Sequence, residues 1–371
     1  MNEEPTNERT DDMIETQTTT TKDPWVFGAR DNRHRGIDVE NDGQPLTVSQ
    51  AIKQGGLDWL VELRDIMSKD EDQIDGEDFQ MSVKVEDVLA DGQIERQHKV
   101  LGIVKGRYTL LQNRDAFSFF DRATLEGAAV IKAVGHLDYG RVVWAVAERP
   151  DGIELYPGEV VRPKLILLTA HDGSHAVKVM FSASRDTSGT MLGVKPGARL
   201  RTEVRVRHTK SIDERMLDLH NVLSAESGYF DRWRAALIGT ESKPGFKQRI
   251  VTEDQIQKVV AGLFPSQTKK DEDGNNYEDV STRAANARKL IEDRIADQAK
   301  VAQAAYANAG QEPPKDGRGQ AGTTALDVFL GVAEFVANDR TAKNDGNPWV
   351  VSTFGTGAAM RQKAFDLIAG L

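Results

Sequence analysis

The chain has 371 residues and no cysteine, and 58 acidic against 48 basic residues give it a net charge of −10. Disulfide bonds, cysteine-ligated zinc and thiol nucleophiles are therefore excluded. No apolar run approaches the roughly 18 residues that cross a bilayer, and the amino terminus lacks the pattern of a signal peptide, so the sequence predicts a cytoplasmic protein with no membrane contact.

The amino-terminal residues 1–45 are predicted to be a disordered acidic tail. Residues 1–23 are rich in Thr and acidic side chains and nearly free of large apolar ones, so they cannot offset the entropy of ordering. Beyond the tail, Val48–Gln54 is predicted as a helix that Thr47 or Ser49 caps and that ends at Gly55 and Gly56, with an edge strand over 57–63.

Alternating apolar and polar residues predict strands over 81–88, 95–104 and 107–111. Asn113 is predicted to cap a helix over 114–124, in which Ala116, Phe117, Phe120 and Ala123 form one apolar face. Two more strands are expected at 128–135 and 141–149.

The strongest hairpin signal lies in residues 163–185. Asp172-Gly173 separates two apolar, partly β-branched runs, a residue pair typical of a tight reversal. Leu165–Leu168 is apolar on both faces, which predicts a strand inside a sheet with a second layer over it. Val177, Val179 and Phe181 alternate with more polar residues, which predicts a half-exposed strand.

A Gly-rich loop over 184–198 leads to a last strand over 200–208, and Ser211–Glu214 reads as a capping box that opens a long amphipathic helix. Together these elements predict an α+β core domain over 46–240. Its antiparallel sheet has five to seven strands, and the helices that begin at Asn113 and Ser211 cover it.

Residues 241–371 are predicted to form a helical carboxy-terminal region. Thr252–Gln255 is a further capping box ahead of a helix over 256–264, and helices are expected at 280–309, 323–340 and 356–371. The Gly- and Pro-rich stretch 311–322 has the composition of a linker.

In this order, several blocks of the chain resemble the phage/plasmid-like protein family, a domain of unknown function (932). The resemblance spans roughly residues 47–371 and rests on 56–59, 107–117, 140–145, 171–174, 205–211, 322–323, 354–355 and 363–364. It implies a mobile-element protein encoded near recombination and antirestriction genes, without an established activity. The chain departs from the family at 184–192, where members commonly carry Cys and Asn residues that are missing here.

No motif predicts catalysis. His171-Asp172 could be an acid/base pair, but a hairpin turn favours these residues for structural reasons. Ser174 and His175 could be a nucleophile and its base, yet neighbours on a strand point to opposite faces. Walker, dinucleotide-binding and zinc-helix motifs are missing from the sequence, so we expect no catalytic residue, metal or cofactor.

The charge distribution gives the sharpest functional signal. Residues 1–100 hold 24 acidic and 11 basic side chains, whereas residues 160–215 hold 5 acidic and 11 basic ones. A basic groove could follow a phosphate backbone. The candidate nucleic-acid-binding residues are Lys178, Arg185, Lys195, Arg199, Arg201, Arg205, Arg207 and Lys210.

Two hypotheses of different classes follow. The first is a single-stranded nucleic-acid-binding or strand-annealing protein of mobile-element DNA metabolism, for which oligomers are conceivable. The second is an interaction module that binds host or phage proteins, such as an antirestriction or host-takeover factor with a DNA-like acidic surface. Cations that converge on an open groove would favour the first hypothesis, and cations paired with Asp70–Asp78 would favour the second.

Overall fold

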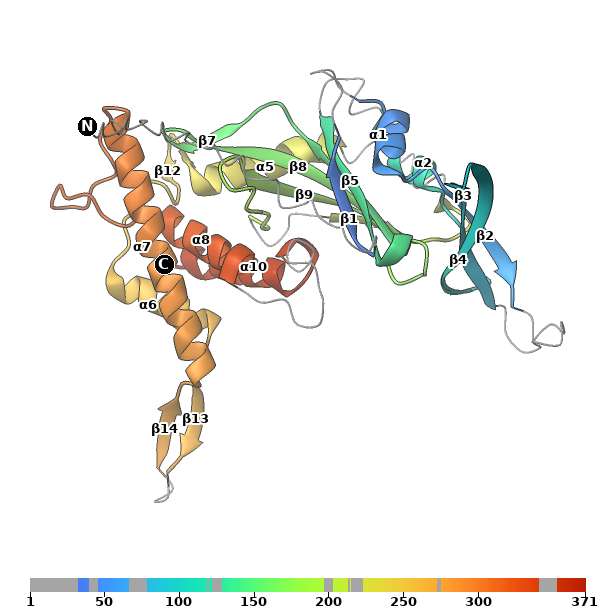
Figure 1. The fold of residues 1–371 in the computed structure, drawn as a ribbon. Coiled ribbons are helices and arrows are strands. Elements are labelled where there is room, and N and C mark those ends of the chain that lie inside the picture. The colour runs from blue at the N-terminus through green and yellow to red at the C-terminus, as the bar shows by residue number, and fades with distance from the viewer. Residues whose placement is uncertain are drawn as a thin grey trace, which may run out of the picture.

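The computed structural model describes residues 33–39, 46–66, 79–118, 120–121, 129–196, 203–212, 214, 223–271, 275–339 and 352–371. Figure 1 shows a large sheet in the middle of the molecule, a small sheet at one end and the carboxy-terminal helices at the other. Most of the predicted tail, the charged stretch Lys69–Asp78, Arg199 and Arg201 lie outside the described residues. The prediction of a disordered tail over 1–45 was wrong for Arg35–Asp38, which form a strand, β1, that pairs with residues 133–136.

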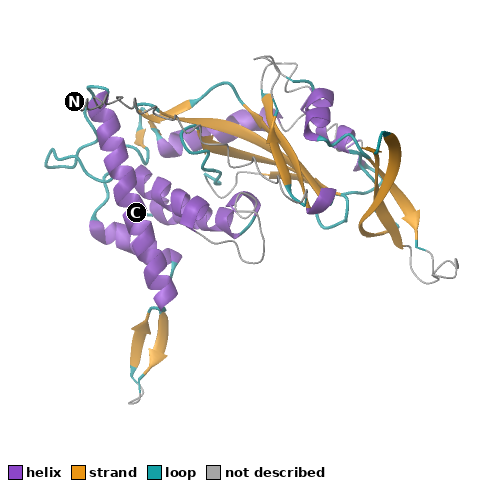
Figure 2. Ribbon diagram, in the orientation of Figure 1, coloured by secondary structure: helices purple, strands orange, loops and turns teal. Residues whose placement is uncertain are grey.

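The large sheet is antiparallel and seven-stranded, with the order β1-β5-β6-β8-β9-β10, and β7 pairs with β8 beside this path. This confirms the predicted α+β class and the expected strand number. Figure 2 distinguishes its strands from the helices packed on them. The strands are β1 (Arg35–Asp38), β5 (Val130–Leu137), β6 (Val142–Glu148), β7 (Ile153–Tyr156), β8 (Glu159–Ala170), β9 (Val177–Arg185) and β10 (Glu203–Val206).

The predicted central hairpin is β8 and β9, with Leu165 opposite Phe181. Leu165 and Leu167 pack in one apolar cluster and Ile166 and Leu168 in another, so β8 is covered on both faces as its sequence predicts. The connection is wider than a two-residue turn, because Thr169 and Ala170 pair with β6 instead of β9.

A second, three-stranded antiparallel sheet has the order β2-β3-β4. Its strands are β2 (Leu60–Asp65), β3 (Phe79–Ala90) and β4 (Gln93–Lys105). The predicted strands 81–88 and 95–104 therefore form a hairpin outside the main sheet. β3 pairs with β4 on one side and with β2 on the other. Residues 107–111 are not a strand: Tyr108–Leu111 run irregularly, and the Tyr108 hydroxyl donates to the Ala170 carbonyl.

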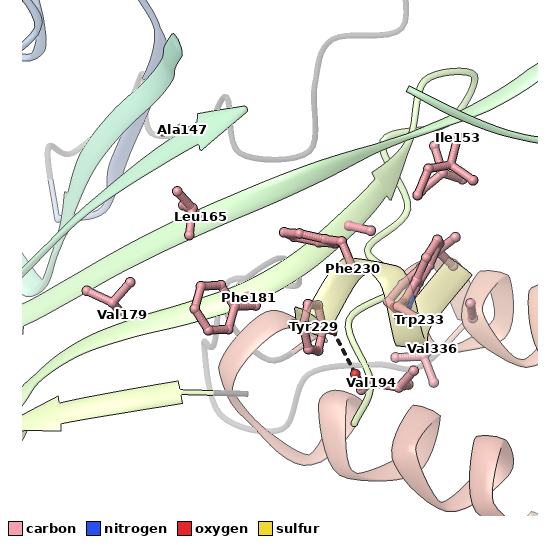
Figure 3. Packing of buried hydrophobic residues seen from close by; sticks show 14 of the residues in the cluster. Ala147, Ile153, Leu165, Val179, Phe181, Val194, Tyr229, Phe230, Trp233 and Val336 are labelled. Carbon is pink, nitrogen blue, oxygen red and sulfur yellow. Dashed lines mark hydrogen bonds between the residues drawn. The ribbon is translucent and has the colours of Figure 1, made fainter. Parts of the chain in front are cut away.

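Two short helices and one long one cover the main sheet: α1 (Val48–Gly55), α2 (Asn113–Phe117) and α5 (Leu223–Leu237). Thr47 caps α1 with the predicted capping box, and Gly56 ends it in the left-handed conformation. Figure 3 shows the α5 side chains Tyr229, Phe230 and Trp233 packed between the sheet and the helices beyond it. Residues 213 and 215–222 of the predicted α5 helix lie outside the described residues.

The sequence predicted that Asn113 caps α2, but it does not. Gln112 is the N-cap residue, and Asn113 is the first helical residue with its side chain buried. Its amide nitrogen donates to the Leu57 carbonyl at 2.8 Å, and its Oδ1 lies 2.8 Å from Nε2 of His171. Residue type alone favours Asn113 as a cap, whereas its side chain is held by two segments distant in the sequence.

The carboxy-terminal region is helical, as predicted, with two small hairpins added. The ion pair between Arg185 and Glu334, together with the contacts described below, joins this region to the sheet. Its helices are α6 (Glu253–Leu263), α7 (Thr282–Asn308), α8 (Ala325–Glu334), a π-helical turn Phe335–Asp339 and α10 (Thr356–Ala369); its hairpins are β11 (Gly239–Thr240) with β12 (Lys243–Pro244) and β13 (Gln267–Lys270) with β14 (Asn276–Asp279). None of the helices in the described part of the chain is long and apolar enough to cross a membrane.

Candidate nucleic-acid interface

A pocket of about 240 Å³ opens on the face of the main sheet formed by β9 and β10, under α10. Three of the predicted cations line it: Lys178 on β9, Lys195 on the loop after β9, and Arg205 on β10. Ile166, Met180 and Phe354 provide apolar parts of the wall. The pocket thus combines positive charge with apolar surface.

Strand pairing brings two of these cations together. Arg205 is the register partner of Lys178, so both side chains leave the same face of the antiparallel pair. Like charges directly opposite one another destabilise a sheet. Burial and the nearby Arg205 lower the pKa of Lys178, and Glu203 forms an ion pair with Arg205. One carboxylate for two cations leaves the pair with excess positive charge that an anion would neutralise.

Lys195 is placed by a helix distant in sequence. The side-chain amide of Gln362 on α10 receives a hydrogen bond from the Lys195 backbone nitrogen at 2.5 Å and donates one to its carbonyl at 3.2 Å. This double contact fixes the backbone at the pocket wall while leaving the ammonium group of Lys195 without an ion pair among the described residues. The main chain is therefore held in place and the cation is available.

The fourth cation of the pocket, Arg361 on α10, was not among the residues predicted from the sequence. Its side chain lines the pocket and is 1% exposed, and Nη1 donates to the Ser352 hydroxyl at 2.9 Å. Within the described residues Nε has no hydrogen-bond partner, and neither does the buried hydroxyl of Thr353 beside it. Burial lowers the pKa of Arg361 to about 10, which still leaves it charged at neutral pH. Because no carboxylate of the described residues pairs with Arg361, its burial as a cation is costly, and an anion in the pocket would compensate it.

Arg207 and Lys210 follow β10 and are exposed. Arg207 is two residues beyond Arg205, so along an extended strand it emerges on the same side. Neither side chain has an ion-pair partner in the described residues. Arg207 thus continues the line of positive charge beyond Arg205, and Lys210 lies three residues further on, in the turn after the strand.

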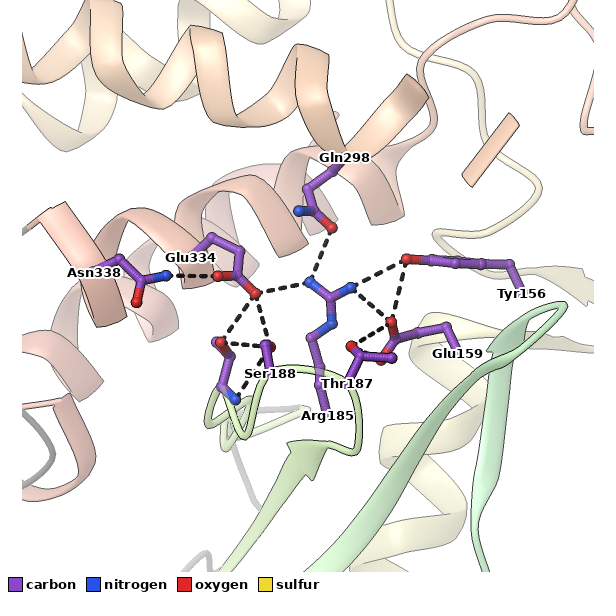
Figure 4. A network of polar contacts seen from close by, with 9 residues as sticks. Tyr156, Glu159, Arg185, Thr187, Ser188, Gln298, Glu334 and Asn338 are labelled. Atoms are coloured by element: carbon purple, nitrogen blue, oxygen red, sulfur yellow. Dashed lines mark hydrogen bonds and ion pairs between the residues drawn. The ribbon is translucent and has the colours of Figure 1, made fainter. Parts of the chain in front are cut away.

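Arg185 does not belong to this surface, contrary to its predicted place on the adjoining loop. Its guanidinium is buried and donates to the Glu159 carboxylate at 2.7 Å and to the Glu334 carboxylate at 2.8 Å. Figure 4 shows this network, which joins the ends of β8 and β9 to α7 and α8. Its other members are Tyr156, Thr187, Ser188, Thr190, Gln298 and Asn338. Two carboxylates already neutralise Arg185, which therefore stabilises the fold.

The turn residues considered for catalysis, Asp172, Ser174 and His175, make hydrogen bonds within the turn. Asp172 accepts a hydrogen bond from the Ser174 backbone nitrogen at 2.9 Å, which is the turn function expected of it. Ser174 and His175 touch, with 2.7 Å between Oγ and Nδ1. The two side chains do not point to opposite faces, contrary to the prediction, because both residues lie in the turn and not on the strand.

The described residues contain no cluster of three or more His, Asp or Glu side chains that could hold a metal ion. Comparison with family models gives one match, a domain of unknown function (DUF932), over residues 100–352. The chain belongs to this family. Neither the comparison with curated proteins nor the comparison with solved structures found a match. The basic pocket lies mainly within the matched segment.

Proposed function

We propose that the protein binds single-stranded nucleic acid, with the pocket between β9, β10 and α10 as the contact site. The observation that carries the proposal is the convergence of Lys178, Lys195 and Arg205 on one pocket, with a single carboxylate, Glu203, among them. Phosphate groups are the ligands that such clusters of Lys and Arg recognise. The proposal includes no catalytic step.

The dimensions of the site favour one strand over two. A pocket of about 240 Å³ has room for part of one strand and not for a duplex, whose major groove alone is about 12 Å wide. Cations near Met180 and Phe354 suit a ligand in which phosphates alternate with bases whose flat faces can stack on apolar side chains. Strand annealing in the DNA metabolism of a mobile element, the setting that the family resemblance implies, is the process that such binding would serve.

The test is a binding assay with single- and double-stranded oligonucleotides over a salt series. We expect a single-strand preference and an affinity that falls with salt. Replacing Lys178→Ala together with Arg205→Ala should lower the salt slope by roughly 1.4, since each lost phosphate contact removes about 0.7. The matched control is Lys289→Ala with Lys300→Ala, which removes the same charge from exposed positions on α7.

An equal loss in both double variants would show that net charge alone controls binding, and would contradict the assignment of the pocket. Absence of binding by the wild type at low salt, where electrostatic attraction is least screened, would contradict the function itself. The second hypothesis, an acidic interaction module, depends on residues such as Asp70–Asp78, which lie outside the described residues. No observed contact of the basic pocket favours it.

A further inference from the structure

The three-stranded sheet carries large apolar side chains on its open face. The pairing of β3 with β4 places Leu89 opposite Ile94, Val83 opposite Val100 and Met81 opposite Ile103, all on one face, and the pairing with β2 adds Leu60 to it. Single exposed apolar residues are ordinary, but several on one face favour an interaction site, and here Asp87, Arg96 and His98 share the face with them. We call these five residues the apolar face: Leu60 (57% exposed), Leu89 (73%), Ile94 (75%), Val100 (49%) and Ile103 (62%).

The edge of the same sheet is open. Within the described residues β4 pairs only with β3, and residues 93–100 are all exposed. A long edge strand presents unpaired N–H and C=O groups to which another strand can add, and proteins usually cover or shorten such an edge. β4, with 13 residues, is among the longest strands of the protein and is neither covered nor short.

The other face of β4 has an uncompensated charge. Lys99 lies directly opposite Lys84, which is an unfavourable pair in a sheet. Lys84 has its own partner, Glu86, at 2.7 Å. Lys99 contacts the Tyr139 ring but no carboxylate among the described residues, and Glu95, four positions away on the same strand, is exposed and lacks a cation there. An acidic side chain from outside would complete the site around Lys99.

We propose that β4 pairs with β4 of a second copy of the chain, antiparallel, about a two-fold axis at Gln97. In an antiparallel self-pairing centred on Gln97, Glu95 of each copy faces Lys99 of the other, and Ile94 faces Val100. Glu95 and Lys99 are then matched on one face of the new sheet. On the other face Ile94 meets Val100, with Arg96 of each copy opposite His98 of the other between them. The self-pairing is isologous, so every favourable contact occurs twice.

The register with its axis at Gln97 pairs the side chains differently from the registers with the axis one residue away. With the axis moved to Arg96, Glu95 would face Gln97 and Ile94 would face His98. With the axis at His98, Lys99 would face Gln97 and Val100 would face Arg96. Of these three positions only Gln97 joins opposite charges and also joins apolar residues. Arg96 remains neutralised by Asp87 of its own copy, at 2.8 Å.

The arrangement leaves room for both molecules. Residues 101–105 form the base of β4, where Leu101 and Val104 are buried against the rest of the fold. Overlap of residues 93–101 of the two copies puts the tip of each hairpin beside the base of the other, and the bodies of the two molecules at opposite ends. Two three-stranded sheets would become one sheet of six strands.

Sedimentation equilibrium of the full chain over a dilution series tests the proposal, and the expected species is a dimer. Glu95→Lys and Lys99→Glu should each weaken the dimer roughly tenfold, because two pairs per dimer change from attraction to repulsion. The double variant that exchanges the two charges should restore the affinity. Both positions are exposed, so thermal melting should show that the monomer fold is kept.

A second measurement tests the axis itself and uses the absence of cysteine from the chain. Gln97→Cys should form a disulfide-linked dimer under mild oxidation, because residues on the two-fold axis have Cα atoms about 4.5–5.5 Å apart. Lys300→Cys on exposed α7 is the control and should stay monomeric on a reducing-agent-free gel. A monomeric wild type, or a dimer that ignores the charge changes and fails to cross-link at Gln97, would overturn the proposal.

Discussion

At the scale of single residues, His171 shows how a polar side chain in a turn sequence can become part of the core. It is fully buried at the end of β8, with Nε2 hydrogen-bonded to Asn113 and the Trp59 ring at 5.4 Å edge-on. Because the Asn113 nitrogen donates to Leu57, its oxygen must accept, so the His171 proton lies on Nε2. The neutral imidazole is the form that this site requires.

The pH dependence of stability should reveal this requirement. Burial lowers the pKa of His171 to about 3 and that of His136 to about 4, whereas in the unfolded chain both titrate near 6.5. Below pH 6.5 the unfolded state therefore binds more protons, and the free energy of unfolding should fall by about 1.4 kcal/mol per pH unit for each histidine. The stability is present above pH 6.5 and decreases towards the folded-state values.

Urea unfolding between pH 7 and 5 measures how steeply the free energy of unfolding falls with decreasing pH. His171→Gln should reduce this slope by the contribution of one histidine. Exposed His98→Gln is the control. If the His171 variant does not fold, the NMR titration of the His171 ring in the wild type serves instead. Protonation of that ring above pH 5 would contradict the buried neutral state.

At the scale of elements, the buried ion network around Arg185 joins the sheet to the carboxy-terminal helices (Figure 4). Arg185→Ala should lower the free energy of unfolding by about 3–5 kcal/mol, since it leaves Glu159 and Glu334 buried without a cation. The control is the neighbouring Arg162→Ala. Arg162 is paired with Asp186 at 2.8 Å in a partly exposed position, so its loss should cost about 0–1 kcal/mol.

Chemical denaturation of the two variants under the same conditions makes the comparison. Similar losses would mean that the buried network contributes no more than a surface ion pair. The elements that Arg185 connects are the reason for the expected difference, because α8 contributes Glu334 and α7 contributes Gln298 to the same guanidinium.

At the scale of the whole molecule, one apolar core crosses the boundary predicted near residue 240. Leu165 and Phe181 of the sheet belong to the same cluster of buried residues as Val259, Phe329 and Phe365 of the carboxy-terminal helices. A fragment of residues 46–240 would expose the apolar surface that those helices cover. The sheet and the helices are thus expected to unfold together.

Thermal unfolding followed by far-UV circular dichroism and by tryptophan fluorescence should give coincident transitions, as two-state behaviour requires. The 46–240 fragment should show no cooperative transition. Two separate transitions in the full chain, or a stable fragment, would contradict a shared core and favour independent domains.

The sequence alone determined the elements whose causes are local. Thr47 and Thr252 cap α1 and α6 through residues three positions away, and β8 could be placed inside a sheet because its apolar residues occupy both faces. The α+β class follows from the order of such elements. Each of these causes acts within a few residues of its effect, so a linear reading is sufficient.

The tertiary structure alone decided the partners of the charged and polar side chains. Arg185 meets Glu334 across 149 residues, Lys195 is held by Gln362 across 167, and Asn113 turns from a predicted cap to a contact with His171 across 58. Composition identified the basic segment but could not say which cations are neutralised and which face an open pocket. That depends on which distant strands and helices meet, because a charge acts through space and not along the chain.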